Sequence, residues 1–362
     1  MNDFIIIGGG IIGLLTAREL ATDGASVTLL EKSETGRESS WAGGGIVSPL
    51  YPWRYADAVT RLAGWSQHYY PQLCQQLRDA SGVDAEYTRN GLLILDADEA
   101  EAAARWAAGS GNELQRIDRG TIAGLEPGLG FLPDSALWLP QVAQVRNPRL
   151  ARAARRALAD RVQLVEAAEV EEILIREGRA VGARTAGATY HAGKTVVCAG
   201  AWSAALFARL GKRPEIVPVR GQMILFRARP GEIRRIVLHQ DRYLIPRRDG
   251  RVLMGSTLEY GGFEKTTTER ARDELFSRAV KLFPKLRHTA IEKQWAGLRP
   301  GAPGGIPYIG AYPGIEGLYL NAGHFRNGVV MGPASARLMA DIALERAPIL
   351  PPQPYTLDAA RN

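Results

Sequence analysis

Three glycines near the start of the chain have the spacing of a phosphate-binding turn. Gly8, Gly10 and Gly13 form the pattern G-x-G-x-x-G within the stretch IIIGGGIIGLL. The first glycine permits a tight turn, the second lets a pyrophosphate approach the backbone, and the third allows close packing of helix and strand. The following helix would present the partial positive charge of its N-terminus to the phosphates. The pattern therefore predicts a dinucleotide site; a glycine-rich turn without a cofactor is the alternative.

Two further features indicate which dinucleotide this would be. Glu31 lies roughly 20 residues further on, where an acidic side chain can accept hydrogen bonds from ribose hydroxyls. In the next segment, ESSWAGGGIVSP (38–49), Ser39 and Ser40 can bond phosphate oxygens, and the glycines at 43–45 let the backbone lie against a flat ring. A nicotinamide cofactor has no need of this second loop. The sequence therefore favours FAD; a merely flexible loop is the alternative.

The segment GHFRNGVVMGP (323–333) precedes a helical pattern near the C-terminus. A reduced flavin carries negative charge, and a helix N-terminus with free N–H groups is a suitable receptor for that charge. Gly328, Val329 and Val330 are the expected donors. The alternative is an ordinary loop before a surface helix.

One arginine stands among small and rigid residues in the stretch QWAGLRPGAPGGIPYIG (294–310). Arg299 carries a permanent charge, and its planar fork can hold a carboxylate in both position and plane. Gly297, Pro300 and Gly301 would keep such a clamp from drifting. We expect Arg299 to bind a substrate carboxylate; a surface turn or an ion pair inside the protein is the alternative.

The elements that must position these residues follow from the apolar spacing and from the glycines and prolines. Strands are expected at 3–7, 26–31, 91–96, 136–139, 194–203, 221–228, 242–247, 251–257 and 317–323, and helices at 11–24, 55–80, 147–160 and about 332–345. Gly24 is the expected C-cap of the first helix. Asn147 is the expected N-cap of the third, with Pro148 in its first turn.

These patterns predict an α/β protein of two discontinuous lobes. Residues 1–82, 147–216 and 300–362 would form a Rossmann-like FAD domain, because the N-terminal order is strand, turn, helix, strand. Residues 83–146 and 217–299 would form a substrate domain with helices and an antiparallel or mixed β-sheet, because turns rather than crossover helices join their strands. At 362 residues the chain is long enough for both lobes.

The composition sets further limits. Lys and Arg outnumber Asp and Glu by 45 to 38, with basic clusters at 146–156, 227–235 and 246–251. No aromatic residues alternate with these charges, so we expect a solvated arginine-rich surface rather than a nucleic-acid partner. No apolar run is long enough for a membrane span. Cys74 and Cys198 alone give neither a disulfide framework nor a metal site, and we expect a cytoplasmic protein.

With these pieces in place, the chain resembles the D-amino-acid oxidase family of FAD-dependent enzymes over nearly its whole length. The resemblance rests on five stretches in the same order: IIIGGGIIGLLTAREL, SSWAGGGI, TVVCAGAWS, WAGLRPG and AGHFRNG. The last two are most similar to the glycine oxidases of thiamine biosynthesis. The resemblance implies oxidation of glycine, and of sarcosine or small D-amino acids, by hydride transfer from Cα to flavin N5. The products would be an imine or 2-oxo acid, ammonia and hydrogen peroxide.

The resemblance also assigns roles to single residues. Arg299 would clamp the carboxylate, Tyr243 would be its hydrogen-bonding partner, and Arg326 would be a second substrate-side cation. FAD contacts are implied at Ile11, Ile12, Glu31, Lys32, Ser39, Ser40, Gly44, Gly45, Ile46, Val170, His324, Phe325, Arg326, Asn327, Gly328, Val329 and Val330, with Ala199, Gly200 and Trp202 packing near the cofactor. Sarcosine oxidases usually hold flavin through a cysteine near the position of Pro313, which neither cysteine matches, so FAD would be noncovalent.

Two positions depart from the pattern of the resemblance. In glycine oxidases the position of Asp241 can be a histidine and that of Leu258 a methionine, and both positions lie near the pocket. The preference for the substrate's side chain therefore stays open. The implied partners are an amino-acid substrate, molecular oxygen and further copies of the chain, as in a tetramer, with no membrane. Two other functions stay open: an FAD-dependent oxidoreductase that modifies aminomethyl uridine in tRNA, and an amino-acid dehydrogenase that passes its electrons to a partner.

Overall fold

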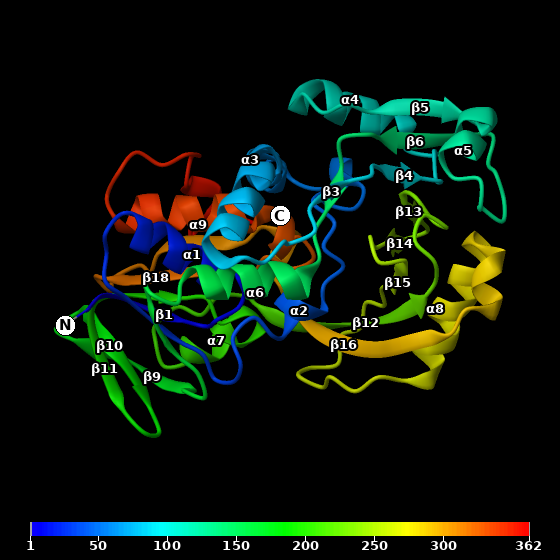
Figure 1. Cartoon of the computed structure of the whole chain (residues 1–362). Helices are drawn as coiled ribbons and strands as arrows, with labels where there is room; N and C mark the ends of the chain where they lie inside the picture. Colours follow the sequence, from blue (N-terminus) through cyan, green and yellow to red (C-terminus); the bar gives the residue numbers. More distant parts are fainter. Residues whose placement is uncertain (1, 362) are drawn as a thin grey trace.

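The computed structural model describes residues 2–361 and divides them between two lobes that lie side by side (Figure 1). Each lobe is built on an eight-stranded sheet. The chain passes between the lobes more than once, so each sheet contains strands that are far apart in the sequence. The expected fold class, a two-lobed α/β flavoprotein fold with a Rossmann-like unit and a mixed second sheet, is confirmed.

The first sheet has the strand order β17-β18-β11-β1-β2-β8, and β10 and β9 extend it from β11. Its strands are β1 (Asn2–Ile7), β2 (Val27–Leu30), β8 (Gln163–Val165), β9 (Val170–Arg176), β10 (Arg179–Thr185), β11 (Thr189–Val197), β17 (Tyr308–Ala311) and β18 (Leu318–Ala322). The central strands β18, β11, β1, β2 and β8 run parallel. Residues 4–7 of β1 and all of β2 are buried, which explains why these segments, FIII and VTLL, are almost entirely apolar.

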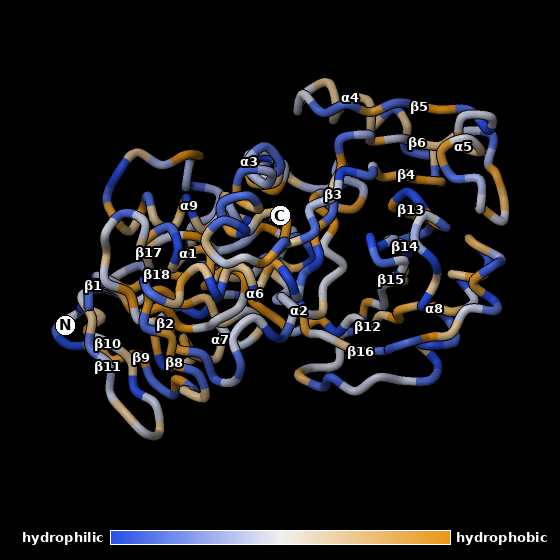
Figure 2. Tube along the Cα trace, viewed as in Figure 1, coloured by the Kyte–Doolittle hydropathy of each residue, from blue (hydrophilic) through white to orange (hydrophobic). Residues whose placement is uncertain are grey.

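Helices cover this sheet on the side where α1 (Ile11–Thr22) packs against α9 (Gly328–Ala343). The long helix α3 (Asp57–Ser81) packs on α9, and α6 (Asn147–Ala157) packs on α3. Apolar side chains from all four helices join those of β1 and β2 in one core. Figure 2 shows hydrophobic segments gathered around β1, β2 and β8. Within residues 2–361 no helix is long and apolar enough to cross a membrane.

The second sheet has the order β16-β12-β15-β14-β13-β4-β6-β5. Its strands are β4 (Leu92–Ile94), β5 (Gln115–Asp118), β6 (Ser135–Leu139), β12 (Val217–Arg227), β13 (Ile236–His239), β14 (Arg242–Pro246), β15 (Arg251–Gly255) and β16 (Ile291–Gly301). All neighbours are antiparallel except β13 and β4. The helices α4 (Ala100–Ser110), α5 (Arg119–Leu125) and α8 (Glu269–Leu282) belong to this lobe. Strands β12 and β16 extend back to the first lobe (Figure 1).

Short elements make the connections. They are α2 (Ser39–Ala42), α7 (Ser203–Leu206), β3 (Thr88–Arg89), β7 (Ala143–Gln144), and the 3₁₀ turns η1 (Pro52–Arg54), η2 (Gly200–Trp202), η3 (Pro284–His288), η4 (Pro303–Gly305) and η5 (Gln353–Tyr355). The strands of the two sheets fall into the two sets of residues that the sequence assigns to the lobes, except that β16 continues to Gly301, two residues past the expected boundary. The exact domain boundaries stay a prediction.

Several local expectations need correction. The first helix ends at Thr22 and is capped by Asp23, with Gly24 one residue beyond at φ +88°. Helix α6 begins at Asn147 itself, so Arg146 occupies the N-cap position. The buried Asn147 side chain packs against the loop 43–45 instead of capping the helix.

The two segments nearest the site also differ from expectation. The last helix begins at Gly328, four residues earlier than expected, which places the expected N–H donors in its first turn. Arg299 lies in an 11-residue strand, β16, and not in a turn. The ladder between β16 and β12, in which Arg299 pairs with Val219, holds its backbone in place, and the contribution of the rigid residues beside it stays a prediction.

Candidate active site

A long cavity lies where the two lobes meet, and both lobes line it. From the first lobe come the carboxyl ends of β1, β2, β11 and β18 and the first turns of α1 and α9. From the second lobe come Tyr243 of β14, Ser256 just after β15, and Arg299 of β16. The cavity therefore lies at the carboxyl edge of a parallel sheet, where ligands of such folds bind.

The glycine motif forms the tightest part of this wall. Gly8 has φ +108°, and a Cβ there would lie 2.5 Å from the carbonyl oxygen of Cys198. A Cβ at Gly13 would lie 1.9 Å from the carbonyl oxygen of Gly8, so this third glycine allows α1 to pack on β1. Gly8 and Gly10 line the cavity, whereas Gly13 faces away from it. Gly8 and Gly13 thus leave no room for a side chain, as their places in the motif predict, and the approach of a pyrophosphate to Gly10 stays a prediction.

Two side chains accept hydrogen bonds from the backbone at the start of α1. The Oγ of Ser40 accepts a hydrogen bond from the backbone N–H of Ile11 at 2.8 Å, which leaves the hydroxyl proton free to be donated to a ligand. One Glu31 oxygen accepts from the N–H of Gly9 at 2.7 Å, and the other accepts from the N–H of Ser33 at 2.9 Å. Glu31 therefore ties the glycine turn to the end of β2 while it lines the cavity.

Another part of the cavity wall is the start of α9. Because the backbone N–H groups of its first turn have no intrahelical acceptor, Gly328 and Val329 present polar edges to the cavity. The Nδ2 of Asn327, a residue only 3% exposed, has no hydrogen-bond partner among the described residues. Val330 points instead into the core. Buried donors left without acceptors at a cavity wall are what an acceptor-rich ligand would satisfy.

His324 lies in the same wall and is 1% exposed. Its Nε2 lies 3.0 Å from the Oγ of Ser335. Burial lowers the pKa of His324 to about 3, so the ring is neutral at physiological pH and is a very weak base. The structure therefore gives His324 a packing and hydrogen-bonding place rather than an acid–base role.

These features fit an FAD molecule. The glycine turn, the free hydroxyl proton of Ser40 and the unsatisfied donors at the start of α9 all face one elongated cavity. Dinucleotide phosphates and an electron-rich ring offer the acceptors that these donors lack. Lys32 lies over the ring of Trp202, 3.4 Å from its centroid, and both line the same cavity.

The guanidinium of Arg299 faces the cavity from the second lobe. Its Nη2 donates to the Oγ of Ser256 at 2.6 Å, and its Nη1 donates to the carbonyl of Thr257 at 3.3 Å. Burial lowers the pKa of Arg299, an effect that the nearby Tyr243 opposes and the Arg326 cation reinforces. Arginine remains charged at neutral pH even so.

The ring of Tyr243 is held between two glycines. A Cβ at Gly44 would lie 3.1 Å from the ring, and a Cβ at Gly255 would lie 2.9 Å from it. Gly44 belongs to the loop expected to face the flavin, so this loop and the Tyr243 ring pack directly on each other. The placement brings the predicted tyrosine and the predicted flavin loop to one end of the cavity.

Neither arginine at this end has a carboxylate partner. Across residues 2–361, no ion pair joins Arg299 or Arg326 to an Asp or Glu. The carboxylates that line the cavity belong to the segments 31–38 and 168–170. Two cations without a counter-ion, facing a cavity, form a receptor for an anion such as a substrate carboxylate.

A third arginine supports the flavin loop from behind. Arg247 follows β14 directly and is 9% exposed. Its Nη2 donates to the carbonyl of Gly44 at 2.7 Å, and its Nη1 donates to Gln144 Oε1 at 2.6 Å and to the carbonyl of Val145 at 3.0 Å. Burial lowers the pKa of Arg247 to about 10, which leaves it charged at pH 7.

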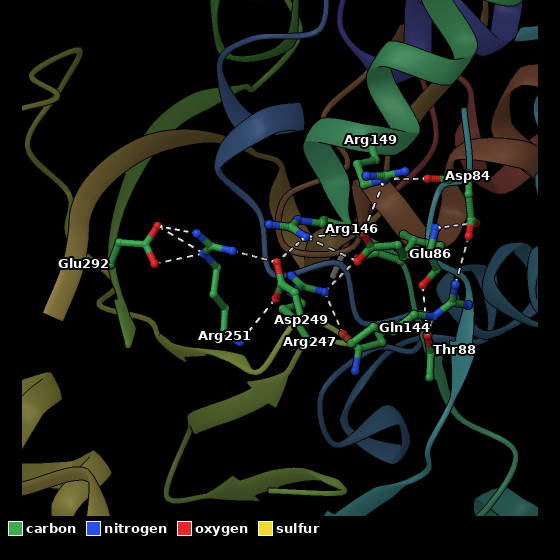
Figure 3. A network of polar contacts seen from close by, with 12 residues as sticks. Asp84, Glu86, Thr88, Gln144, Arg146, Arg149, Arg247, Asp249, Arg251 and Glu292 are labelled. Atoms are coloured by element: carbon green, nitrogen blue, oxygen red, sulfur yellow. Dashed lines mark hydrogen bonds and ion pairs between the residues drawn. The ribbon is translucent and has the colours of Figure 1, made fainter. Parts of the chain in front are cut away.

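Figure 3 shows the network around Arg247. Arg146 bonds Asp249 and Arg251 bonds Glu292, whereas no ion pair is recorded for Arg247 within the described chain. The expectation of a solvated arginine surface is wrong for Arg247, because its guanidinium is buried and donates to carbonyl and amide oxygens of residues far away in the sequence. The clusters at 146–156 and 246–251 are otherwise largely occupied with neighbouring carboxylates.

The structure brings most of the predicted site residues to this cavity. Those that line it are Gly8, Gly10, Ile11, Ile12, Glu31, Lys32, Ser39, Ser40, Gly44, Gly45, Ile46, Val170, Ala199, Gly200, Trp202, Tyr243, Arg299, His324, Phe325, Arg326, Asn327, Gly328 and Val329. Gly13 and Val330 lie behind its wall. Asp241 and Leu258, expected near the pocket, are not among the lining residues. The functional assignments of all these residues stay predictions.

Some residues at the site carry no signal in the sequence. Ser256 and Arg247 were not expected there, and Ser48 and Leu50 also line the cavity. A serine in the stretch GSTLE and an arginine in PRRDGR look like surface residues. Only the pairing of β12, β15 and β16 brings Ser256 to Arg299.

Comparison with known proteins agrees with this geometry. The family model of FAD-dependent oxidoreductases (DAO) matches residues 3–342. The glycine oxidase of Pseudomonas aeruginosa is 49% identical over 97% of each chain, and 95% of this chain matches 52% of a bifunctional protein ThiO/ThiG of Synechocystis at 31% identity. The crystal structure of glycine oxidase from Geobacillus kaustophilus superposes with a TM-score of 0.93 at 30% identity, covering 99% of both chains. The chain therefore belongs to the DAO family of FAD-dependent oxidoreductases.

Proposed function

We propose that this protein catalyses the FAD-dependent oxidative deamination of glycine. The observation that carries the proposal is a pair of arginines, Arg299 and Arg326, that have no carboxylate partner among residues 2–361 and line the cofactor cavity together with the flavin loop and Tyr243. Glycine oxidases of up to 49% identity support glycine as the substrate. Sarcosine and small D-amino acids present the same carboxylate and amine, and we include them as secondary substrates.

The residues of the chain hold the substrate in place. Arg299 binds the carboxylate through its planar fork, and the O–H of Tyr243 donates to the same group. Arg326 adds a second positive charge. When bound, FAD would supply the two-electron oxidant for the bond between Cα and hydrogen, with oxygen as the final acceptor and hydrogen peroxide as its product. The resulting imine is hydrolysed to a 2-oxo acid and ammonia.

No side-chain base is needed for the amine. Two arginine cations in the cavity disfavour an ammonium group beside them, so the ammonium group of free glycine gives its proton to water on binding and the substrate is held with a neutral amine. His324 cannot take up a proton near neutral pH, because burial holds its pKa at about 3. The chain thus contributes orientation and charge, and the hydride donor needs no further activation.

The biological setting of the reaction is part of the same proposal. The match to the bifunctional protein ThiO/ThiG supports a product that enters thiazole synthesis for thiamine. We further propose noncovalent FAD, oxygen as the acceptor, a cytoplasmic location and a homo-oligomer such as a tetramer. Action on tRNA has less support, because the arginine clusters at 146–156 and 246–251 are largely ion-paired.

One experiment tests the proposal directly. The visible spectrum of the FAD-loaded protein is recorded without oxygen, before and after glycine is added. We expect glycine to bleach the flavin band, and air to restore it with release of hydrogen peroxide. Bleaching without peroxide on admission of air would favour the dehydrogenase alternative. A spectrum that glycine leaves unchanged would contradict the proposed substrate.

A further inference from the structure

Ser256 occupies an unusual place in the cavity wall. It directly follows β15, where Gly255 still pairs with Met223 of β12. Its side chain is 4% exposed and faces the same space as Arg299 and Tyr243. Tyr243 lies in β14 and Arg299 in β16, which β12 separates from β15, so three different strands or strand ends of the second sheet each supply one polar group to the cavity.

The direction of one hydrogen bond fixes what the hydroxyl of Ser256 can do. The bond between Arg299 Nη2 and Ser256 Oγ is 2.6 Å long. A guanidinium can only donate, so the serine oxygen is the acceptor. The hydroxyl proton must therefore point elsewhere, and within residues 2–361 no protein acceptor is recorded for it. The cavity is the remaining space.

The same contact restricts the guanidinium. A Cβ at Gly221 would lie 2.1 Å from Nη1 and 2.3 Å from Nη2, so the fork lies against the bare backbone of this glycine. The carbonyl of Thr257 accepts from Nη1 at 3.3 Å. Two of the five guanidinium protons are thereby directed toward the segment 256–257, and the orientation of the fork is set by that segment.

We propose that Ser256 positions the Arg299 guanidinium and donates its own hydroxyl proton to the carboxylate that Arg299 binds. This inference rests on the proposed function, which supplies the carboxylate. It makes Ser256 a substrate-binding residue that determines how tightly, and in which plane, the carboxylate is held. The carboxylate then accepts from three sources, namely Arg299, Tyr243 and Ser256.

The test uses acetate, a carboxylate without an amine, on the FAD-loaded protein. Its dissociation constant is measured by calorimetry and by the change in flavin absorbance. We expect Ser256→Ala to raise the Kd for acetate about 10-fold, as the loss of one hydrogen bond to a charged group does. The KM for glycine should rise by a similar factor, with kcat changed by less than about 3-fold, because the contact is made in the bound and transition states alike.

Two further variants separate positioning from general damage. Ser256→Cys keeps the shape but offers a weaker donor, so its Kd should lie between those of the wild type and Ser256→Ala. In an Arg299→Lys background, Ser256→Ala should change the Kd by less than about 3-fold, because the coupling partner is already lost. Ser66→Ala is the matched control, since Ser66 is a fully buried serine that accepts from the N–H of Ala334 away from the cavity.

The outcomes distinguish this inference from the proposed function. An unchanged acetate Kd in FAD-loaded Ser256→Ala would overturn the role of Ser256. If Ser256→Ala raises the acetate Kd by the full factor in the Arg299→Lys background as well, Ser256 does not act by positioning Arg299. If acetate binding depends on Ser256 but glycine does not reduce the flavin, the inference stands and only the proposed substrate is overturned. A wild type that does not bind acetate would overturn both.

Discussion

Gly221 lies directly against the guanidinium of Arg299: a Cβ at this glycine would lie 2.1 Å from Nη1, 2.3 Å from Nη2 and 2.5 Å from Cζ. The two residues are on neighbouring strands, where Gly221 pairs with Gly297 and Arg299 pairs with Val219. The absence of a side chain at Gly221 therefore lets the Arg299 side chain pass over β12 and reach Ser256 and Thr257, just beyond β15. A single methyl group would compete with the guanidinium for the same space.

Gly221→Ala should consequently displace the clamp without unfolding the protein. The atoms that the new methyl group meets are the far end of a flexible side chain, so the guanidinium can move while the β12–β16 ladder stays intact. A shift of about 1 Å in a positioning group costs on the order of 100-fold in rate. We expect kcat/KM for glycine to fall by about that factor, measured as peroxide release, with full FAD content.

Gly64→Ala is the matched control for this substitution. Gly64 lies in α3, and a Cβ there would meet nothing within 4 Å. Its kcat/KM should equal that of the wild type. If kcat/KM of Gly221→Ala also stays within about 3-fold of the wild type, turnover of glycine does not depend on the present position of the Arg299 guanidinium.

Arg299→Ala should abolish most of the activity while FAD stays bound. The substitution removes the bidentate donor to the substrate carboxylate, and a charge-assisted pair of this kind is worth roughly 3 kcal/mol or about 100-fold in kcat/KM. The protein partners of Arg299 are Ser256 and Thr257, both in the second lobe. The flavin absorbance per protein should therefore not change.

Arg116→Ala serves as the control, because Arg116 is an exposed residue of β5 with only Ser135 as a hydrogen-bond partner. Its kcat/KM for glycine should match that of the wild type. Full activity of Arg299→Ala would show that the carboxylate is bound elsewhere in the cavity.

The sequence predicts the glycine turn between β1 and α1 well, and there is a physical reason for this. The roles of Gly8 and Gly13 depend on local backbone geometry, and a glycine spacing records such geometry directly. The fold class follows in the same way, since apolar runs and turn residues report the strands one by one.

Side-chain environments made by distant segments are not recorded in this way. Asn147 is the expected N-cap, yet it is already the first residue of α6, and its side chain packs against Gly43 and Gly45. Arg247 has the sequence of a surface turn, yet three carbonyl and amide oxygens from residues about 100 to 200 positions away hold it inside. In both cases tertiary packing overrides a local preference.

Arg247→Met should weaken FAD binding. The substitution leaves the carbonyl oxygens of Gly44 and Val145 and the amide oxygen of Gln144 without their buried donor. Each orphaned acceptor costs roughly 1–3 kcal/mol, and Gly44 is free to move away from Tyr243. We expect the Kd for FAD, measured by quenching of flavin fluorescence on addition of the apoprotein, to rise at least about 10-fold.

The neighbouring Arg248 provides the control for this prediction. Its guanidinium is half exposed and bonds Asp84, Thr88 and the carbonyl of Tyr87. Arg248→Met should leave the Kd for FAD within about 2-fold of the wild type, because exposed ion pairs contribute little. An equal loss of FAD affinity in both variants would mean that Arg247 acts only through general stability.

The pH dependence of stability should carry the signature of His324. Burial lowers its folded-state pKa to about 3 from the ordinary value near 6.5, so between these values the unfolded chain binds a proton that the folded protein excludes. The contribution of the neutral ring is therefore complete above about pH 6.5 and is lost as the pH falls toward 3. In His324→Gln this dependence is absent. The difference in Tm between wild type and His324→Gln, measured from pH 8 down to pH 4, should shift steadily against the wild type below pH 6.5. A difference that stays constant over this range would mean that the His324 ring is protonated as readily in the folded protein as in the unfolded chain.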